Sequence, residues 1–481
     1  MIMKINKAWY KDKLYACWLG KNIGGTLGAP YEGCTETLNV TGYKTKPGEP
    51  LPNDDLDLQL LWLYAIEQQG ANRLNQNLLA DYWLDWIPAH WNEYGIAKTN
   101  MRMGLLPPLC GELDNEQWKT SNGAWIRSEI WAALAPFFSD IAMKYAAMDA
   151  MVDHGISEGT YAEMYTAALQ SAAYVETDIR KVIDIALSKI PDESRISNAV
   201  KLVIECYENG EDYLSVREKL VDQSKDIGMF QAPANIGFVT IGLLYGEGDF
   251  KKSVLYAINC GDDTDCTGAT VGATMGILGG MAAIPEDWRA YIGDRIVMVA
   301  LNGQGTYHLP QSCTELTDRV MKVVPEIMKA NGIEMEYTDG ETEIESVLLE
   351  KFNSKSVEEL LPMGKYSYEI LHYTPIWARV EILENPVIAS MERRRVKVTF
   401  FNRFQDAKRL NLNLILPEGW SAESYRKTLR VDMQVNQTSD GESVSFEIQA
   451  GEKVDAINRV YLEVTGCTFV QTIVIPILFI G

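Results

Sequence analysis

The hydrophobic pattern of the chain changes once, near residues 360–364, and this change constrains the fold more than any other feature. Before it, long stretches without Pro or Gly carry apolar residues at three- and four-residue intervals, the period of an amphipathic helix. After it, short runs alternate apolar and polar residues between turn-like sequences, as strands with one buried face do. The sequence therefore predicts a mainly α protein, with an all-α domain over residues 1–360 followed by a small all-β domain over residues 365–481.

Individual elements can be placed within each part. Helices are expected at Asn75–Trp86, at Tyr161–Tyr174 and at Ile179–Ile190, the last with Asp178 as its cap. The expected strands are Arg395–Phe401, Asn411–Leu416, Leu429–Val435, Val444–Ile448 and Val460–Val464. Strands at this spacing indicate a β-sandwich. The apolar tail 469–481 is too short to span a membrane as a helix, and we expect it to form a buried final strand.

The charge of the chain limits its partners. The 481 residues include 44 Lys and Arg against 66 Asp and Glu, a formal net charge of −22. Residues 361–481 hold 14 of each sign, so the whole excess lies in the first 360 residues. Binding to nucleic acid needs a basic footprint, and an anionic membrane surface attracts basic segments. We therefore expect neither nucleic acid nor a membrane as a partner.

Cysteine and histidine usage suggests the compartment. The eight Cys show no CxxC pair and no regular spacing, which is typical of reduced thiols in a cytosolic protein. The N-terminal sequence lacks the continuous apolar run of a signal peptide. Four His are too dispersed for a zinc cluster to be recognised. A cytoplasmic location is the expectation.

Two acidic clusters stand far apart in the sequence, each just before an apolar helical run. The first is Asn53-Asp54-Asp55-Leu56-Asp57, and the second is the segment 261–267, Gly-Asp-Asp-Thr-Asp-Cys-Thr. Helix capping explains one or two carboxylates at a helix start. Three so close together repel one another unless a cation compensates them, and oxygen ligands suit Mg²⁺ or Mn²⁺. From spacing alone, a metal site and an ordinary acidic loop are equally favoured.

Small residues accompany both clusters. The segment 20–33 begins as a Gly-rich helix and ends in a loop that contains Glu32, and residues 268–280 are also rich in Gly and Ala. Small residues let two helices approach closely, so we expect these helices to bring the acidic ends together. A third feature is the polar turn Asn122-Gly123-Ala124 in front of an amphipathic helix.

The order of these motifs resembles that of the ADP-ribosylglycohydrolase family. Between residues 15 and 280 the chain carries G-x-x-x-G-x-x-x-G-A-P-Y-E, N-D-D, N-G-A-x-x-R, a His-Gly pair and G-x-D-T-D. The resemblance implies an all-α bundle that binds two Mg²⁺ or Mn²⁺ ions through the two acidic motifs. It also implies hydrolysis of the glycosidic bond that links ADP-ribose to a side chain or to another ADP-ribose. The predicted β-sandwich lies outside the resemblance.

The resemblance assigns roles to particular positions. The implied metal ligands are Asn53, Asp54, Asp55, Asp263, Asp265 and Thr267. Glu32 and Asp55 are the candidate catalytic carboxylates, either of which can act as general base for a water molecule. The implied substrate-binding residues are Asn122, Gly123, His154 and Gly261.

The chain departs from the family's pattern at three of these places. Asn53 stands where Thr or Ser is more usual, and Leu56 stands where Thr is frequent. Cys266 aligns with a Thr ligand, and a thiol is a poor ligand for Mg²⁺. We therefore expect that position to rely on Thr267, Thr264 or water.

Several neighbouring residues have simpler explanations. Asp57 lies one helical turn from Asn53 and can either support the metal ligands or face solvent, of which we favour solvent. We expect Asp262 to cap the second helix rather than to bind metal. Arg127 fits the start of an amphipathic helix, although it can also pair with a nucleotide. The polar side chains of Gln231 and Asn235 are candidates to line the cleft.

Three functions remain open from the sequence. The leading hypothesis is a metal-dependent hydrolase acting on an ADP-ribosylated protein or a ribosyl small molecule. The second is a catalytically silent module that binds ADP-ribose or a related nucleotide, and the third is a hydrolase of an unrelated ribosidic metabolite. Nothing in the sequence indicates the oligomeric state.

Overall fold

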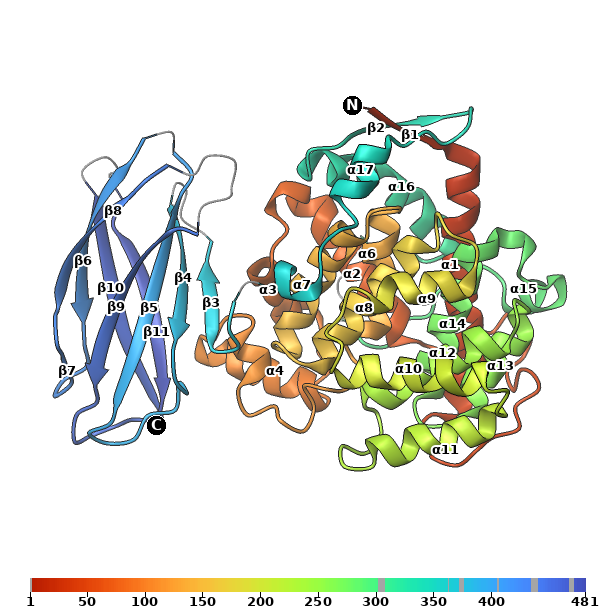
Figure 1. Cartoon of the computed structure of the whole chain (residues 1–481), viewed down its shortest axis with the longest axis horizontal. Coiled ribbons are helices and arrows are strands. Elements are labelled where there is room, and N and C mark those ends of the chain that lie inside the picture. The colour runs from red at the N-terminus through yellow and green to blue at the C-terminus, as the bar shows by residue number, and fades with distance from the viewer. Residues whose placement is uncertain are drawn as a thin grey trace. The chain divides into compact units, whose positions relative to one another are not determined.

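The chain is described here from a computed structural model (Figure 1). The structure describes residues 2–301, 308–361, 363–371, 376–404, 406–433, 440–466 and 471–481. By internal contacts the chain divides into two compact units, one of Met1–Ile96 with Asp114–Pro362 and one of Ala97–Leu113 with Met363–Gly481. The first unit is mainly helical and the second contains antiparallel sheets, so the predicted fold class is confirmed.

Helices make up most of the first unit. Their bounds are α1 (Lys7–Gly28), α2 (Asp54–Gln69), α3 (Gln76–Trp86), α4 (Asn92–Met103), α5 (Leu109–Glu112), α6 (Glu129–Leu134), α7 (Ser139–Asp153), α8 (Glu158–Ala172), α9 (Ile179–Leu187), α10 (Arg195–Glu208), α11 (Tyr213–Ser224), α12 (Ala232–Tyr245), α13 (Phe250–Asn259), α14 (Thr264–Gly279), α15 (Glu286–Ile292), α16 (Cys313–Ala330), α17 (Ser346–Lys351) and α18 (Val357–Leu360). Short 3₁₀ turns lie at Ala29–Tyr31, Ala71–Arg73, Trp125–Arg127 and Gly280–Ala282. The segment Ala97–Leu113, which contains the end of α4 and all of α5, belongs to the second unit.

The predicted helices are confirmed, with small shifts at their ends. Asn75 accepts hydrogen bonds from the N–H groups of Asn77 and Leu78 and so caps α3. Asp178 caps α9 in the same way, as predicted. That helix ends at Leu187, three residues before the predicted end, because the last turn loosens ahead of Pro191.

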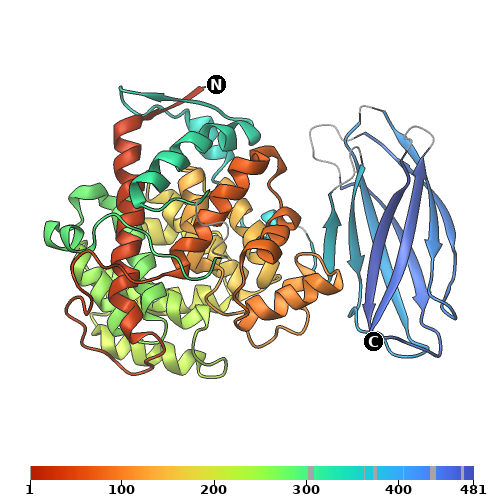
Figure 2. The ribbon, with the colours of Figure 1, turned by 180° about the vertical axis from the view of Figure 1, so that it is seen from behind.

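The close packing of α1 on α14 determines the geometry of the first unit. A Cβ atom at Gly20 would collide with the carbonyl group of Gly272, and one at Gly24 would collide with the carbonyl group of Gly268. Figure 2 shows α1 from behind, continuing directly from strand β1 (Ile2–Asn6). The small residues therefore allow backbone-to-backbone contact between the two helices, as the sequence predicted.

Helix α14 is also a core element. Every residue from Thr264 to Ile277 is buried. Among the described residues, no single helix has the length and hydropathy needed to cross a membrane, and only the bent pair Thr264–Ala282 with Glu286–Ile292 meets the test, by length and composition alone.

Strands form one small sheet in the first unit and two larger sheets in the second. Strand β1 pairs in parallel with β2 (Glu334–Thr338). In the second unit one antiparallel sheet has the order β11-β10-β6-β8 and the other the order β3-β4-β5-β9-β7. The strand bounds are β3 (Ser367–Ile370), β4 (Ile376–Ile382), β5 (Arg393–Asn402), β6 (Lys408–Ile415), β7 (Ser421–Ala422), β8 (Arg426–Val431), β9 (Glu442–Gln449), β10 (Ile457–Gly466) and β11 (Ile473–Ile480).

Alternation along these strands explains the sandwich. In β6 the residues Leu410, Leu412 and Leu414 are buried while their neighbours are more exposed, and β4 alternates in the same way. Each sheet therefore has one apolar face to bury. The predicted strands are confirmed with shifted ends, including the buried last strand β11. Strand β8 ends at Val431, so Asp432 and Met433 of the predicted strand Leu429–Val435 are not in a strand, and residues 434–435 and 469–470 of two predictions lie outside the described residues.

Candidate functional site

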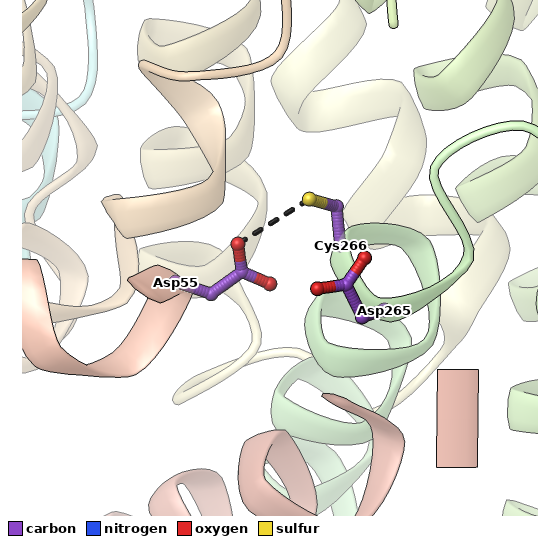
Figure 3. Close-up of side chains that lie close together, drawn as sticks. All are labelled: Asp55, Asp265 and Cys266. Carbon is purple, nitrogen blue, oxygen red and sulfur yellow. Dashed lines mark hydrogen bonds between the residues drawn. The ribbon is translucent and has the colours of Figure 1, made fainter. Parts of the chain in front are cut away.

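The first turns of α2 and α14 bring the two acidic clusters together. Asn53 precedes α2 in extended conformation, and Asp263 precedes α14. Oxygen atoms of Asp55 and Asp265 and the sulfur of Cys266 all lie within 4.8 Å of one another (Figure 3). Oxygen atoms of Glu32, Asp263 and Asp265 form a second such group, also within 4.8 Å. Asp265 is common to both groups, so the clusters make one continuous site.

The acidic side chains are buried without the partners that burial requires. Asp55 is 0% exposed and Asp265 is 6% exposed. One carboxylate oxygen each of Asp55, Asp263 and Asp265 has no hydrogen-bond partner among the described residues, and neither amide atom of Asn53 has one. A buried charge without a partner is costly, and a cation removes that cost. The arrangement and the chemistry of these atoms therefore fit a divalent cation.

The pKa values reflect the same crowding. Burial and the charge of Asp265 raise the pKa of Asp54 to about 6. Burial and the charges of Asp265 and Asp54 raise the pKa of Glu32, an exposed side chain at the edge of the cluster, to about 7. Burial raises the pKa of Asp55 and of Asp263 well above the usual range of a carboxyl group. In the metal-free protein, protons and cations therefore compete for this site.

The buried Lys21 near the cluster forms an ion pair with Glu129, a carboxylate outside the cluster. Lys21 Nζ lies 3.0 Å from Glu129 Oε2 and donates a 2.7 Å hydrogen bond to the Ile126 carbonyl oxygen. Its charge lowers the pKa of Asp55, but burial has the larger, opposite effect. One paired lysine does not neutralise the carboxylates of two helix starts.

Two asparagines hold Asp263 in place. Asn122 donates a 2.7 Å hydrogen bond from Nδ2 to Asp263 Oδ2, and its Oδ1 accepts from Trp125 Nε1 at 3.0 Å. Asn235 Oδ1 accepts from the backbone N–H of Asp263 at 3.4 Å. Asn122, predicted to bind substrate, thus also orients a predicted metal ligand. Gln231 is buried and donates to the Gln117 carbonyl oxygen at 3.2 Å.

The two predicted substrate-binding glycines lie where a side chain has no room. A Cβ at Gly123 would collide with the carboxylate of Glu93. Gly261 has a φ of 79°, and a Cβ there would lie 2.5 Å from the Glu36 carbonyl oxygen and 2.6 Å from that of Cys34. Both positions therefore favour glycine, Gly261 for its positive φ and both for lack of space.

His154 lies at the end of α7 and is fully buried. Its Nε2 is 3.1 Å from Ser121 Oγ, and its Nδ1 is 2.9 Å from Asp153 Oδ1. A carboxylate oxygen of Glu93 joins Asp153 and His154 in a group whose atoms lie within 4.8 Å of one another. Ser121 precedes Asn122, so this group borders the predicted substrate turn. Glu93 was not predicted, because no motif in the sequence links the start of α4 to the His-Gly pair.

Two expectations for acidic residues are wrong. Asp57 is 0% exposed rather than solvent-facing, and its Oδ2 accepts hydrogen bonds from the N–H groups of Val299 and Ala300 at 2.6 and 2.9 Å. Asp262 does not cap α14. Its Oδ1 accepts a hydrogen bond from the Phe230 N–H at 2.8 Å, and its own backbone has a φ of 65°. In both cases a distant loop supplies the donor, so local spacing contained no signal for it.

Thr267 and Arg127 also have hydrogen-bond or ion-pair partners within the protein. Thr267, a predicted ligand, donates its hydroxyl hydrogen to the Asp263 carbonyl oxygen at 3.0 Å. Arg127 is completely buried, where its side chain pairs with Asp149 at 3.0 Å and with Asp153 at 2.8 Å. The expected amphipathic helix start does not describe Arg127, because the guanidinium belongs to a buried ion-pair network.

A helical bundle in which two acidic helix starts lie close together is the arrangement that the resemblance seen in the sequence implies. Residues 6–322, more than half of the chain, match the family model described as ADP-ribosylglycohydrolase. The chain therefore belongs to the ADP-ribosylglycohydrolase family, and the predicted resemblance is confirmed.

Individual relatives are distant. An uncharacterized protein of Archaeoglobus fulgidus is 25% identical over 312 residues, which are 59% of this chain and 93% of that protein. A solved chain of an ADP-ribosylglycohydrolase-related protein complex has a TM-score of 0.44 and 19% identity, covering 66% of this chain and 99% of its own. A FixG-related protein from Vibrio parahaemolyticus has a TM-score of 0.18 and 18% identity, over 23% of this chain and 98% of its own.

Proposed function

We propose that this protein is a metal-dependent hydrolase that cleaves an N- or O-glycosidic bond of an ADP-ribosyl group or a related ribosyl compound. The observation that carries the proposal is the convergence of buried carboxylate oxygens of Asp55, Asp263 and Asp265, which have no hydrogen-bond partner in the described part of the chain. Family membership supports glycosidic hydrolysis as the reaction class. With a net charge of −22, the protein needs cations or helix N-termini to hold a pyrophosphate.

The residues that would hold two Mg²⁺ or Mn²⁺ ions are Asn53, Asp54, Asp55, Asp263, Asp265 and Thr267. Bound divalent cations supply positive charge to substrate oxygens and lower the pKa of a bound water molecule. The chain's own contribution is to fix the ligands: Asn122 and Asn235 hold Asp263, and the start of α14 presents Asp265 next to Asp55.

Glu32 is suited to move a proton during the reaction. Its exposed position gives it access to water, and its carboxylate can accept a proton. As general base, Glu32 would take a proton from the water that attacks the anomeric carbon as the glycosidic bond breaks. The leaving group would then receive that proton from Glu32, directly or through solvent. Asp55, the second candidate for the general base, is completely buried and contacts Cys266. Its position suits the role of a metal ligand better than that of a base.

The substrate is expected to lie against the turns that border the cluster. Asn122 and Gly123 form one turn, Gly261 belongs to the other, and His154 lies behind Ser121. Backbone groups at glycine turns approach a ribose or phosphate closely, which side chains at these positions would prevent.

Hydrolysis assays on purified protein test the proposal. With Mg²⁺ or Mn²⁺, we expect release of ADP-ribose or ribose from at least one member of a panel of ADP-ribosylated proteins, nucleosides and ribosyl compounds. Asp55→Asn and Asp263→Asn should abolish turnover and the stabilisation by metal. Asp57→Asn is the matched control, since it also replaces a buried carboxylate of this cluster with an amide. The amide oxygen can still accept the hydrogen bonds from the N–H groups of Val299 and Ala300, so turnover should persist.

Each outcome separates the candidate functions. Unchanged turnover in both ligand variants would refute the proposed site. ADP-ribose binding by calorimetry with no hydrolysis across the panel would instead identify a silent binding module. Cleavage of nucleosides alone would identify a hydrolase of another ribosidic metabolite.

A further inference from the structure

The thiol of Cys266 lies inside the candidate metal site. Its sulfur donates a hydrogen bond to Asp55 Oδ1 at 3.3 Å, drawn as the dashed line in Figure 3. The Asp265 carboxylate approaches the same space from the first turn of α14. The sulfur and the two carboxylates therefore face one another across a gap of the size that a single cation fills, with their atoms within 4.8 Å.

Two further oxygens point to a ligand at this place. Asp55 Oδ2 and Asp265 Oδ1 are buried and have no hydrogen-bond partner in the described ranges. The three residues are 0%, 6% and 5% exposed, in the order Asp55, Asp265 and Cys266. Unpaired carboxylate oxygens this deep need a cation or a proton. The thiol is therefore not an isolated cysteine but the third donor of a buried set.

The neighbouring group of donors has a different chemistry. Glu32, Asp263 and Asp265 offer oxygen atoms only, and Glu32 is exposed. Asp265 belongs to both groups, so the two positions adjoin. Thiolate ligands favour Zn²⁺ and other soft or borderline ions, while carboxylates and water suit Mg²⁺ and Mn²⁺. The two positions are thus chemically unequal.

We propose that the inner position, formed by Asp55, Asp265 and Cys266, takes a thiophilic divalent cation such as Zn²⁺ in preference to Mg²⁺. The outer position, formed by the oxygen donors of Asp263 and Asp265 beside Glu32, takes a hard cation. The proposal rests on the proposed function only in using the same site, because it concerns which ion binds and not whether hydrolysis follows.

Co²⁺ is the probe for sulfur ligation, since a thiolate bound to Co²⁺ gives a charge-transfer absorption that oxygen ligands do not. The titration uses metal-free full-length protein in a Cys34→Ser background, because Cys34 is an exposed thiol that can bind the probe. We expect the absorption to rise and to saturate at one equivalent. Cys266→Ser should abolish it, and Cys206→Ser, which removes another buried thiol, should leave it unchanged.

Competition between ions gives a second readout. Calorimetry should show that Cys266→Ser weakens Zn²⁺ binding by more than the roughly tenfold that loss of a residue supporting a ligand costs, while Mg²⁺ binding changes far less. Cys266→Thr, which restores an oxygen ligand, should shift the preference toward Mg²⁺. Circular dichroism of each variant checks its fold, and the Co²⁺ spectrum of the Cys34→Ser protein is recorded with the site itself unchanged.

The results separate this inference from the proposed function. A charge-transfer band in a protein with no hydrolytic activity supports the inference and rejects the function. Hydrolysis with Mg²⁺ in a protein that shows no band, or a band that persists in Cys266→Ser, supports the function and overturns the inference. Equal Zn²⁺ affinity in the wild type and Cys266→Ser also overturns it.

Discussion

Replacing Gly24 with alanine tests whether the contact between α1 and α14 holds the site together. A Cβ at Gly24 would meet the carbonyl group of Gly268 and would lie 2.6 Å from the backbone nitrogen of Ala269. These are backbone atoms, which cannot move aside as the end of a flexible side chain can. The helices must therefore separate, and overpacking of a close contact costs about 1–3 kcal/mol or more.

We expect Gly24→Ala to lower the free energy of unfolding by about 3 kcal/mol, at the upper end of the overpacking range, measured by urea unfolding with circular dichroism. Since α14 carries Asp265 in its first turn, the same variant should also weaken Mn²⁺ binding in calorimetry. Gly42→Ala is the control, because no described atom lies within 4 Å of its added Cβ. An unfolding midpoint for Gly24→Ala equal to that of Gly42→Ala would refute the reasoning.

Three further predictions follow from the site and its surroundings. The pKa values of Asp54 and Glu32 are raised to about 6 and about 7, so the protonated forms favour the folded state. Their contribution to stability is complete below the ordinary carboxyl range and is lost as the pH rises from about 4 through about 7, the window between unfolded and folded pKa values. Urea unfolding of metal-free protein should show this loss of stability, and saturating Mg²⁺ should cancel it. An unfolding midpoint that does not change with pH would contradict the raised pKa values of Asp54 and Glu32. Asn122→Ala removes the hydrogen bond to Asp263 and should weaken Mn²⁺ binding about 10- to 100-fold in calorimetry, whereas an unchanged affinity would show that Asp263 needs no support. Asp178→Ala removes the cap of α9 and should cost about 1 kcal/mol in urea unfolding with no change in Mn²⁺ affinity, and a loss of affinity would mean that α9 is coupled to the site.

The features that local sequence determines were predicted well. Helix starts at Asn75 and Asp178 depend on a side chain two or three residues from its partner, so a short window contains the whole signal. The strand runs were recognisable because alternation of burial is also local. The close approach of α1 and α14 followed from the glycine spacing in both helices.

Features that depend on distant segments were missed or misassigned. Asp57 is held by N–H groups of Val299 and Ala300, and Asp262 by the N–H of Phe230. Glu93 meets His154 only in the folded chain. In each case the partner lies too far along the chain for spacing to reveal it, and burial then changes what the charge can do.

The beginning of α14 shows both sides of this limit. From the sequence, Asp263 and Asp265 were identified as candidate ligands, and Cys266 was seen to stand where an oxygen ligand is expected. It did not show that the sulfur points at Asp55, which depends on the fold that brings α2 and α14 together, each in contact with α1. The departure at Cys266 therefore became a chemical hypothesis only when the fold was known.

Anomalous X-ray scattering from crystals grown with Mn²⁺ tests the central claim most directly. We predict a peak within bonding distance of Asp55 or Asp265 and a second beside Glu32 and Asp263. Asp55, Asp263 and Asp265 supply the unpaired oxygens, and these residues belong to the two donor groups. A map with no peak at either group, at a Mn²⁺ concentration that stabilises the protein against heat, would contradict the assignment of these carboxylates as a metal centre.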